Sequence, residues 1–125
     1  MRLSATGMVL LLPLLAFSAP AETGPDDRQL DARFTDTIHP FLETYCVKCH
    51  SGEKPKGHFD ISGYSSPALI ARDYSEWSVA ADKLTAKEMP PENAQRQPGD
   101  EARQAVIGWL ADIRKNEARK NAGRK

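Results

Sequence analysis

Five consecutive residues of this 125-residue chain bring together two thiols and an imidazole. They read Cys46-Val47-Lys48-Cys49-His50, and the chain has no cysteine besides these two. Cysteines at positions i and i+3 of a helical turn point to the same side. Two sulfurs placed in this way can form thioethers with the vinyl groups on one edge of a haem, and the next histidine can bind the iron. The spacing therefore predicts one covalent haem c, attached at Cys46 and Cys49 with His50 as an axial ligand.

The same two cysteines could instead form a redox dithiol, a disulfide or half of a zinc site. A thioredoxin-like dithiol accompanies a βαβ pattern, and this sequence shows no alternating strand pattern of useful length. A disulfide would close a very small loop, which constrains the chain little and leaves His50 unexplained. Structural zinc takes four ligands, typically from two such pairs, and only one pair is present. Covalent haem is the interpretation that uses all three residues.

A haem that carries electrons needs a second axial ligand, and Met89 is the candidate. It is the only methionine after residue 21, and Pro90 and Pro91 follow it. A residue before proline is pushed toward an extended conformation, and two prolines stiffen the loop. Taken alone, a methionine more often fills a gap in a core. Downstream of the Cys46–His50 motif, the stiff loop favours iron ligation by the Met89 thioether.

Two other histidines compete for the iron. His39 precedes Cys46 by about two helical turns, which predicts a position far from the distal face. His58 follows the motif closely and could reach a haem edge or propionate. We expect both to be surface histidines. Basic residues that could pair with propionates are present, and the sequence does not select among Lys54, Lys56 and Arg72.

Apolar side chains recur at helical spacing in three segments. The first helix is predicted over residues 31–46, with a kink at Pro40, which lacks a backbone donor. The second is predicted over residues 75–86, with Asp73 and Glu76 as a capping box, and the third begins at Asp100 as the N-cap. The expected buried faces are Leu30, Phe34, Ile38 and Leu42; Trp77, Ala80 or Ala81, and Leu84; and Ala102, Val106, Trp109 and Ile113.

The stretch 51–72 is rich in Gly, Ser and Pro and is expected to be a long irregular loop. A loop of that length in a small domain usually wraps a ligand or has a function. We therefore expect an all-α fold of about three helices around one haem.

The first 21 residues resemble a secretory signal. Arg2 precedes the apolar run Met8–Phe17, which is too short to span a bilayer. Ala19 and Ala21 form an A-x-A pattern, so we expect cleavage after Ala21, export to the periplasm and no membrane span afterwards. Residues 22–113 would form the haem domain. Residues 114–125 form a basic tail with six positive charges and one negative, which is most simply a solvated helix extension.

The composition after residue 21 indicates a thin core. Leu, Ile, Val and Phe make up only 16 of these 104 residues. Small domains of this kind usually need a disulfide, a metal or a cofactor to complete them. The formal net charge of the whole chain is zero, and we expect a monomer that binds no nucleic acid.

The stretch from Ile38 to Ile113 resembles the planctomycete-type cytochrome c domain. The matching pieces are Pro40-Phe41-Leu42 before CVKCH, Lys56-Gly57-His58-Phe59-Asp60, Trp77, MPP at 89–91, Val106 and Trp109-Leu110. The resemblance implies a cytochrome c-like helical fold whose first and last helices cross. It also implies haem at Cys46 and Cys49, with axial ligands His50 and Met89. In that family the domain often accompanies larger exported domains.

The function expected from these features is that of a periplasmic mono-haem electron carrier, not an enzyme. Its partners would be other periplasmic redox proteins, a larger exported oxidoreductase among them. Three alternatives stay open at the level of sequence. A haem peroxidase or a gas or haem sensor would need an open or labile sixth iron position, and the peroxidase also an acid/base group, for which His58 is the candidate. A thiol–disulfide oxidoreductase would need no haem.

Overall fold

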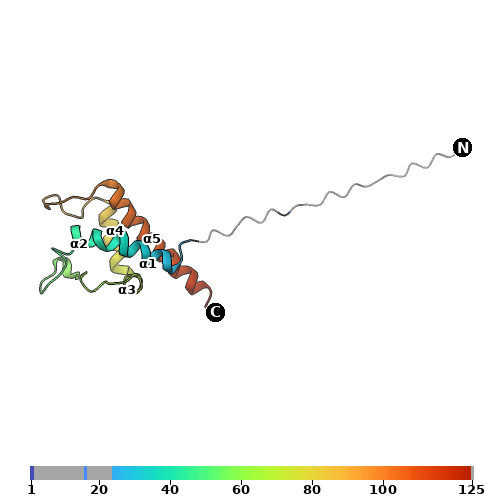
Figure 1. Ribbon diagram of the computed structural model, residues 1–125, viewed down its shortest axis with the longest axis horizontal. Coiled ribbons are helices and arrows are strands. Elements are labelled where there is room, and N and C mark those ends of the chain that lie inside the picture. The colour runs from blue at the N-terminus through green and yellow to red at the C-terminus, as the bar shows by residue number, and fades with distance from the viewer. Residues whose placement is uncertain (2–15, 17–23, 125) are drawn as a thin grey trace.

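The structure, a computed structural model, describes Met1, Ala16 and residues 24–124 (Figure 1). Its helical elements in chain order are α1 (Asp27–Arg33), the π-helical turn η1 (Phe34–Ile38), α2 (His39–Tyr45), the 3₁₀ turn η2 (Lys56–His58), α3 (Pro67–Arg72), α4 (Tyr74–Thr85) and α5 (Asp100–Ala122). The described residues form no strand, so the predicted all-α class is confirmed. The predicted signal lies outside the described residues, apart from Met1 and Ala16. No helix in the described part is both long and apolar enough to cross a bilayer.

The N-terminal helical run α1–η1–α2 begins earlier than the sequence predicts. A capping box that the sequence analysis missed starts it: the Asp26 carboxylate accepts from the Gln29 backbone N–H at 2.9 Å, and the Gln29 side-chain oxygen accepts from the Asp26 backbone N–H at 3.1 Å. Each group satisfies a backbone donor that a helix start would leave free. The run ends at Tyr45, immediately before the Cys46–His50 motif, as predicted.

Pro40 does not end this run, because the backbone widens just before it. Residues Phe34–Ile38 form a π-helical turn, in which the His39 backbone N–H donates to the Phe34 carbonyl. Proline removes a donor and crowds the carbonyl four residues earlier, and a wider turn accommodates both effects. Where the sequence predicts a kink at Pro40, the structure has a local π turn just before it. Both Phe34 and Ile38 stay buried through it.

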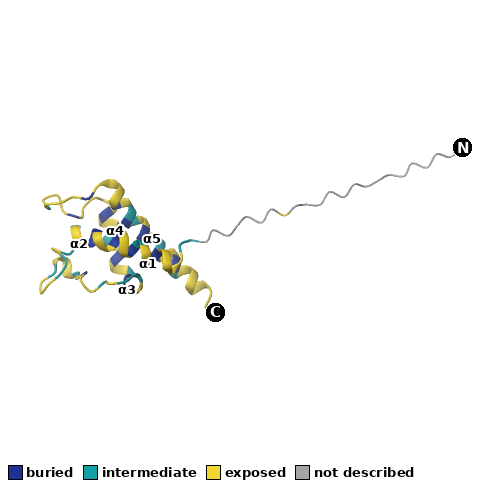
Figure 2. Cartoon of the chain, in the orientation of Figure 1, coloured by how far each residue is buried: buried dark blue, intermediate teal, exposed yellow. Residues whose placement is uncertain are grey.

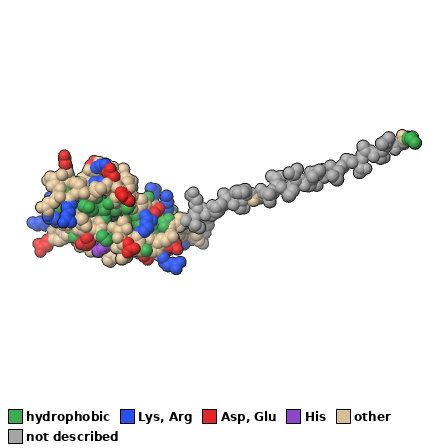
Figure 3. Space-filling view, turned by 45° about the horizontal axis from the view of Figure 1, so that its top comes forward, with side chains coloured by type: hydrophobic (Ala, Val, Ile, Leu, Met, Phe, Trp, Pro, Cys, Tyr) green, Lys and Arg blue, Asp and Glu red, His purple; other side chains and the backbone are tan. Residues whose placement is uncertain are grey.

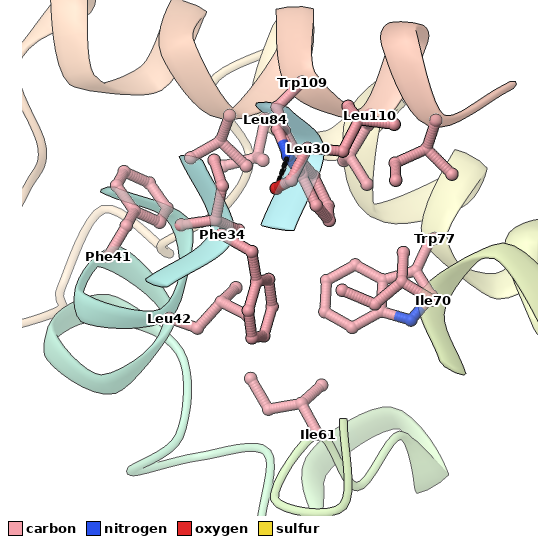
Figure 4. Close-up of a cluster of buried hydrophobic side chains, with 13 residues drawn as sticks. Leu30, Phe34, Phe41, Leu42, Ile61, Ile70, Trp77, Leu84, Trp109 and Leu110 are labelled. Atoms are coloured by element: carbon pink, nitrogen blue, oxygen red, sulfur yellow. Dashed lines mark hydrogen bonds between the residues drawn. The ribbon is translucent and has the colours of Figure 1, made fainter. Parts of the chain in front are cut away.

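Helix α5 is the centre of the packing. It contacts α1, η1, α3 and, most extensively, α4, and it runs alongside these helices in Figure 1. Trp109 is completely buried, and its indole N–H donates to the Leu30 carbonyl at 3.1 Å (Figure 4). The Phe34 ring packs 5.7 Å from the Trp109 ring, measured between centroids. One buried aromatic side chain thus ties the first helix to the last by apolar contact and a hydrogen bond.

Thirteen apolar side chains of the described residues form one buried core, and Figure 2 shows the buried residues in dark blue. They come from every α-helix, from η1 and from the loop before α3: Leu30, Phe34, Ile38, Phe41, Leu42, Ile61, Ile70, Trp77, Leu84, Val106, Trp109, Leu110 and Ile113. The predicted apolar face of the first helix is fully confirmed, since all four of its residues are buried. The predicted face of the second is confirmed for Trp77 and Leu84, with Ala80 and Ala81 partly buried.

Asp73 is the N-cap of α4, but neither Asp73 nor Asp100 forms the side-chain cap that the sequence predicts, and the reason is the same. Asp73 makes no side-chain bond to the start of α4, because its carboxylate accepts from Arg72 at 2.9 and 2.7 Å and from the Tyr64 hydroxyl at 2.9 Å. Asp100 is the first residue of α5, while Gly99 is the N-cap, and the Asp100 carboxylate pairs with Lys87 at 2.8 Å. In both cases the carboxylate pairs with a nearby residue outside the helix and makes no bond to the backbone N–H groups at the helix start.

On α5 the predicted face also contains one error. Val106, Trp109 and Ile113 are buried as expected, but Ala102 is exposed. The adjacent Arg103 is buried in its place. The sequence analysis also missed α3, which lies inside the stretch expected to be irregular.

The predicted basic tail is the last part of α5, which continues to Ala122. Within it Asn116 is buried, and its side-chain NH₂ donates to the Asp27 carboxylate at 2.6 Å. Lys120 pairs with the same carboxylate at 2.8 Å, and Arg119 donates to the Pro25 carbonyl at 2.7 Å. The segment extends the helix as expected, and one of its faces also holds the start of α1.

Candidate functional site

The Cys46–His50 motif forms a helical turn that continues from the end of α2. The Cys46 backbone N–H donates to the Leu42 carbonyl, and the backbone N–H groups of Cys49 and His50 both donate to the Cys46 carbonyl, at 3.2 and 3.0 Å. Two longer-range bonds fix the exit of the turn. Lys56 N–H donates to the Cys49 carbonyl and Ile61 N–H donates to the His50 carbonyl, both at 2.8 Å.

A cavity of about 320 Å³ opens beside this turn and brings the predicted site residues together. Cys46, His50 and Met89 all line it, although Met89 is far from the motif in sequence. Its volume is at the lower end of the range typical of small-molecule and cofactor sites. Most of the wall is apolar and comes from α2, the loop before α3, α4 and α5: Leu42, Phe59, Ile61, Trp77, Val79, Ala80, Leu84 and Val106.

The His50 imidazole is oriented by the backbone of the following loop. Its Nδ1 lies 3.2 Å from the Phe59 carbonyl oxygen, and its ring lies edge-on to the Phe59 ring at 5.9 Å between centroids. A carbonyl can only accept, so Nδ1 carries the proton in this contact. The lone pair of Nε2 is then available to a metal. This is the arrangement that metal-binding histidines commonly have.

The two cysteines are free thiols in different surroundings. Cys46 is half-buried on the cavity wall, and burial, with the neighbouring Cys49 thiol as a second cause, raises its pKa to about 11. Cys49 is exposed and does not line the cavity. The structure thus brings Cys46, His50 and Met89 together at the cavity, whereas Cys49, which was expected on the same side as Cys46, is exposed and does not line it.

Met89 is held in a loop, residues 86–99, that connects α4 to α5 and is called the Met89 loop below. The backbone N–H groups of Glu88 and Met89 donate to the Lys83 carbonyl at 2.9 and 3.3 Å. Further along, the Gln97 side chain donates to the Pro91 carbonyl at 2.7 Å. Bonds on both sides of Met89 thus restrain the stiff segment that the sequence predicted.

The competing histidines lie elsewhere. His39 is exposed, with Nε2 3.7 Å from the Glu43 carboxylate, and His58 is exposed in η2. Neither lines the cavity. Among the candidate propionate partners, Arg72 pairs with Asp73 at 2.7 Å, while Lys54 and Lys56 are exposed.

Apolar side chains are left uncovered at the cavity. Apart from Met1, the large hydrophobic residues exposed in the described chain are Val79 (55%) and Met89 (37%), and both line it. Figure 3 shows hydrophobic side chains reaching the surface on one face of the domain, between charged ones. The indole N–H of Trp77, also on the wall, is buried without a hydrogen-bond partner. Uncovered apolar surface and an unsatisfied donor both indicate that a largely apolar group with some polar atoms belongs here.

These residues fit a haem. The wall is apolar, one imidazole has a free Nε2, one thioether lines the same space, and a thiol lies at its edge. Residues 24–124 contain no group of three His, Cys, Asp or Glu side chains suited to a metal ion. Haem iron needs no such group, because the porphyrin supplies four of its ligands.

A larger cavity, of about 410 Å³, lies between α1, α3 and the C-terminal half of α5. It contains none of the residues predicted to attach haem or bind its iron. Its charged groups include Asp27 and Lys120, which pair with each other, and Arg72, which pairs with Asp73. Size alone therefore does not identify the site, and the residue chemistry favours the smaller cavity.

Three features in or beside the site were missed by the sequence analysis: the Phe59 carbonyl, Val79 and Arg103, whose Nη1 donates to the Met89 carbonyl. The first is a backbone group that any residue carries, so no sequence signal could reveal it. Val79 lies on α4 two residues after the buried Trp77, so the sequence does not distinguish it from any other residue of the helix. Arg103 did leave a signal in the sequence, because it directly follows Ala102, which was predicted to be buried.

Comparison with protein-family models, with curated proteins and with solved structures finds no match to this chain.

Proposed function

We propose that this chain is a periplasmic mono-haem c-type cytochrome that passes single electrons between redox proteins. The observation that carries the proposal is that Cys46, His50 and Met89 line the same cavity, where the Phe59 carbonyl holds Nδ1 of His50. When bound, haem supplies an iron that changes reversibly between the ferrous and ferric states. No substrate chemistry is required of the protein.

Each residue has a defined part in this proposal. Cys46 and Cys49 would hold haem through thioethers, His50 would bind the iron through Nε2, and Met89 would bind it through its thioether sulfur. The Phe59 carbonyl orients the imidazole, and the apolar wall excludes water. The unpartnered Trp77 N–H is available to an acceptor on the bound group.

The arrangement supports a carrier better than the other functions considered. His58, the candidate acid/base group of a peroxidase, is exposed and does not line the cavity. A redox-active dithiol needs a thiol with a lowered pKa, whereas burial raises the pKa of Cys46. Ligation by both His50 and Met89 would leave no open position for gas binding.

The test is to express the full chain with haem-attachment machinery and extract it with acid–acetone. Haem should stay with the polypeptide in the unmodified protein and in each single Cys→Ala variant, which keeps one thioether. The double variant Cys46→Ala/Cys49→Ala should lose haem to the solvent. An optical redox titration should show one single-electron transition, and carbon monoxide should not bind the reduced protein readily. A colourless polypeptide after extraction of the unmodified protein would refute the proposal.

A further inference from the structure

Arg103 is a buried charge without a carboxylate partner. Its side chain is on α5 and the residue is 4% exposed, yet none of the ion pairs within 4 Å between described residues includes it. Burying a cation costs free energy unless opposite charge or hydrogen bonds compensate. The Arg103 charge helps to lower the pKa of Asp100, but the Asp100 carboxylate pairs with Lys87 and is not in contact with the guanidinium. A buried guanidinium without a carboxylate in contact calls for a specific role.

The hydrogen bonds of Arg103 point to the Met89 loop. Its Nη1 donates to the Met89 carbonyl and, at 3.4 Å, to the Leu84 carbonyl. Its Nε is buried and has no partner. One guanidinium nitrogen thus joins α5 both to the end of α4 and to the residue proposed to bind the iron.

A simple helix cap does not explain these contacts. The Leu84 carbonyl already accepts backbone N–H groups, including that of Lys87 at 3.2 Å. The Met89 carbonyl accepts no backbone bond between described residues, so Arg103 is its partner. The bond that depends on Arg103 is therefore the one to Met89.

Arg103 also lies directly behind the cavity wall. Leu84 and Met89, whose carbonyls it binds, both line the cavity, and so does Val106, three residues further along α5. Arg103 itself does not line it. The guanidinium can thus act on the site through the backbone of Met89 and through its charge, without touching the bound group.

We propose that Arg103 is a positioning residue: it holds the Met89 backbone so that the thioether faces the cavity, and its charge favours the reduced iron. This inference rests on the proposed function. Ferric iron carries one more positive charge than ferrous iron, so a buried cation nearby disfavours oxidation. The two effects separate by substitution, because Lys keeps the charge but lacks the planar set of donors.

The experiment compares haem-loaded Arg103→Met and Arg103→Lys with the unmodified protein. Arg103→Met should remove both the positioning of Met89 and the buried charge, whereas Arg103→Lys should remove only part of the positioning. Losing a hydrogen bond from a charged donor should raise the fraction of molecules with an open sixth iron position roughly 10- to 100-fold. Carbon monoxide should therefore bind Arg103→Met faster by about that factor, with a weaker near-infrared sulfur-to-iron band and a lower potential. Arg103→Lys should show a smaller gain in carbon monoxide binding and a potential close to that of the unmodified protein.

Leu110→Ala is the matched control for lost stability. Leu110 is equally buried on α5 but does not line the cavity, so its truncation should lower the melting temperature without opening the sixth site. If Leu110→Ala and Arg103→Met gain carbon monoxide binding equally at equal loss of melting temperature, Arg103 is merely structural and the inference is overturned.

A measurement on the unmodified protein covers the case in which Arg103→Met does not fold. Nuclear magnetic resonance should show slowly exchanging Arg103 Nη protons and a through-bond coupling to the Met89 carbonyl carbon, and fast exchange without coupling would overturn the inference. Failure of the proposed function looks different. In that case the unmodified protein itself either loses haem on extraction or binds carbon monoxide as fast as Met89→Ala does.

Discussion

The hydrogen bond between His50 and the Phe59 carbonyl decides which ring nitrogen can bind a metal. A free histidine exchanges between two tautomers, and only one leaves Nε2 without a proton. The contact of 3.2 Å at Nδ1 selects that tautomer before any iron is bound. The loop from 51 to 61 thus positions the imidazole, and the bond from Ile61 to the His50 carbonyl fixes the loop in turn.

Replacing Met89 tests the sixth ligand directly. Met89→Ala should let carbon monoxide bind the reduced protein, erase the near-infrared sulfur-to-iron band and lower the potential, because a neutral thioether favours ferrous iron. Met89→His should keep the position closed and still lower the potential. If Met89→Ala leaves spectrum and potential unchanged, the ligand is another residue and the role proposed for Met89 is refuted.

Asp73 provides a pH test at a single residue. The Arg72 guanidinium, and then the Tyr64 hydroxyl, lower its pKa from 3.8 to about 2. A lowered pKa in the folded state means that the stabilisation is complete above the unfolded pKa and is lost as the pH falls from about 4 to about 2. Asp73→Asn should therefore flatten the fall in melting temperature across that range. Asp82→Asn, an exposed acid on α4, is the control and should leave the slope as it is.

At the residue scale, local chemistry could be predicted and non-local partners could not. The Cys46–His50 motif and the Met89-Pro90 segment are recognisable because their spacing or order has a mechanical meaning. Arg103 is recognised only once the Met89 carbonyl is known to lie beside it. The missing side-chain caps at Asp73 and Asp100 have the same origin, because Arg72, Tyr64 and Lys87 compete for their carboxylates.

At the scale of elements, periodicity predicted the buried faces better than the boundaries. A helical face follows from spacing alone, so Leu30 and its three partners were correctly placed. The start of α1 depends on a capping box of Asp26 and Gln29, a variant of the usual pattern. The π turn before Pro40 accommodates the proline while Phe34 and Ile38, at its two ends, stay buried.

The C-terminal part of α5 should contribute to stability through Asn116. Its side chain is buried and donates to the Asp27 carboxylate, whose pKa is lowered first by Lys120 and then by Asn116. Asn116→Ala should lower the free energy of unfolding by about 1–3 kcal/mol, measured by urea unfolding of the haem-loaded protein. Asn121→Ala, exposed on the same helix, should change it by less than about 0.5 kcal/mol. Equal effects of the two substitutions would show that α1 does not depend on this contact.

At the scale of the whole molecule, core and cavity share a wall. Five of the thirteen buried apolar residues also line the cavity: Leu42, Ile61, Trp77, Leu84 and Val106. The other part of the core joins α1 and η1 to α5 through Trp109. A bound haem would cover the first part and leave the second unchanged. The two halves of the domain should therefore depend on the cofactor to different degrees.

Unfolding of the haem-free chain should reveal this difference. Without haem, the wall around Trp77 loses apolar contact and should loosen first, while the contact of α1 with α5 around Trp109 persists to higher temperature or urea concentration. Far-ultraviolet circular dichroism and tryptophan fluorescence of Trp77→Phe, which keeps the Trp109 contact and reports Trp109 alone, should then give transitions that do not coincide. The same variant loaded with haem is the control, and its transitions should merge because haem completes the shared wall. A single sharp transition in the haem-free chain, identical by both probes, would show that the thirteen-residue core suffices without a cofactor.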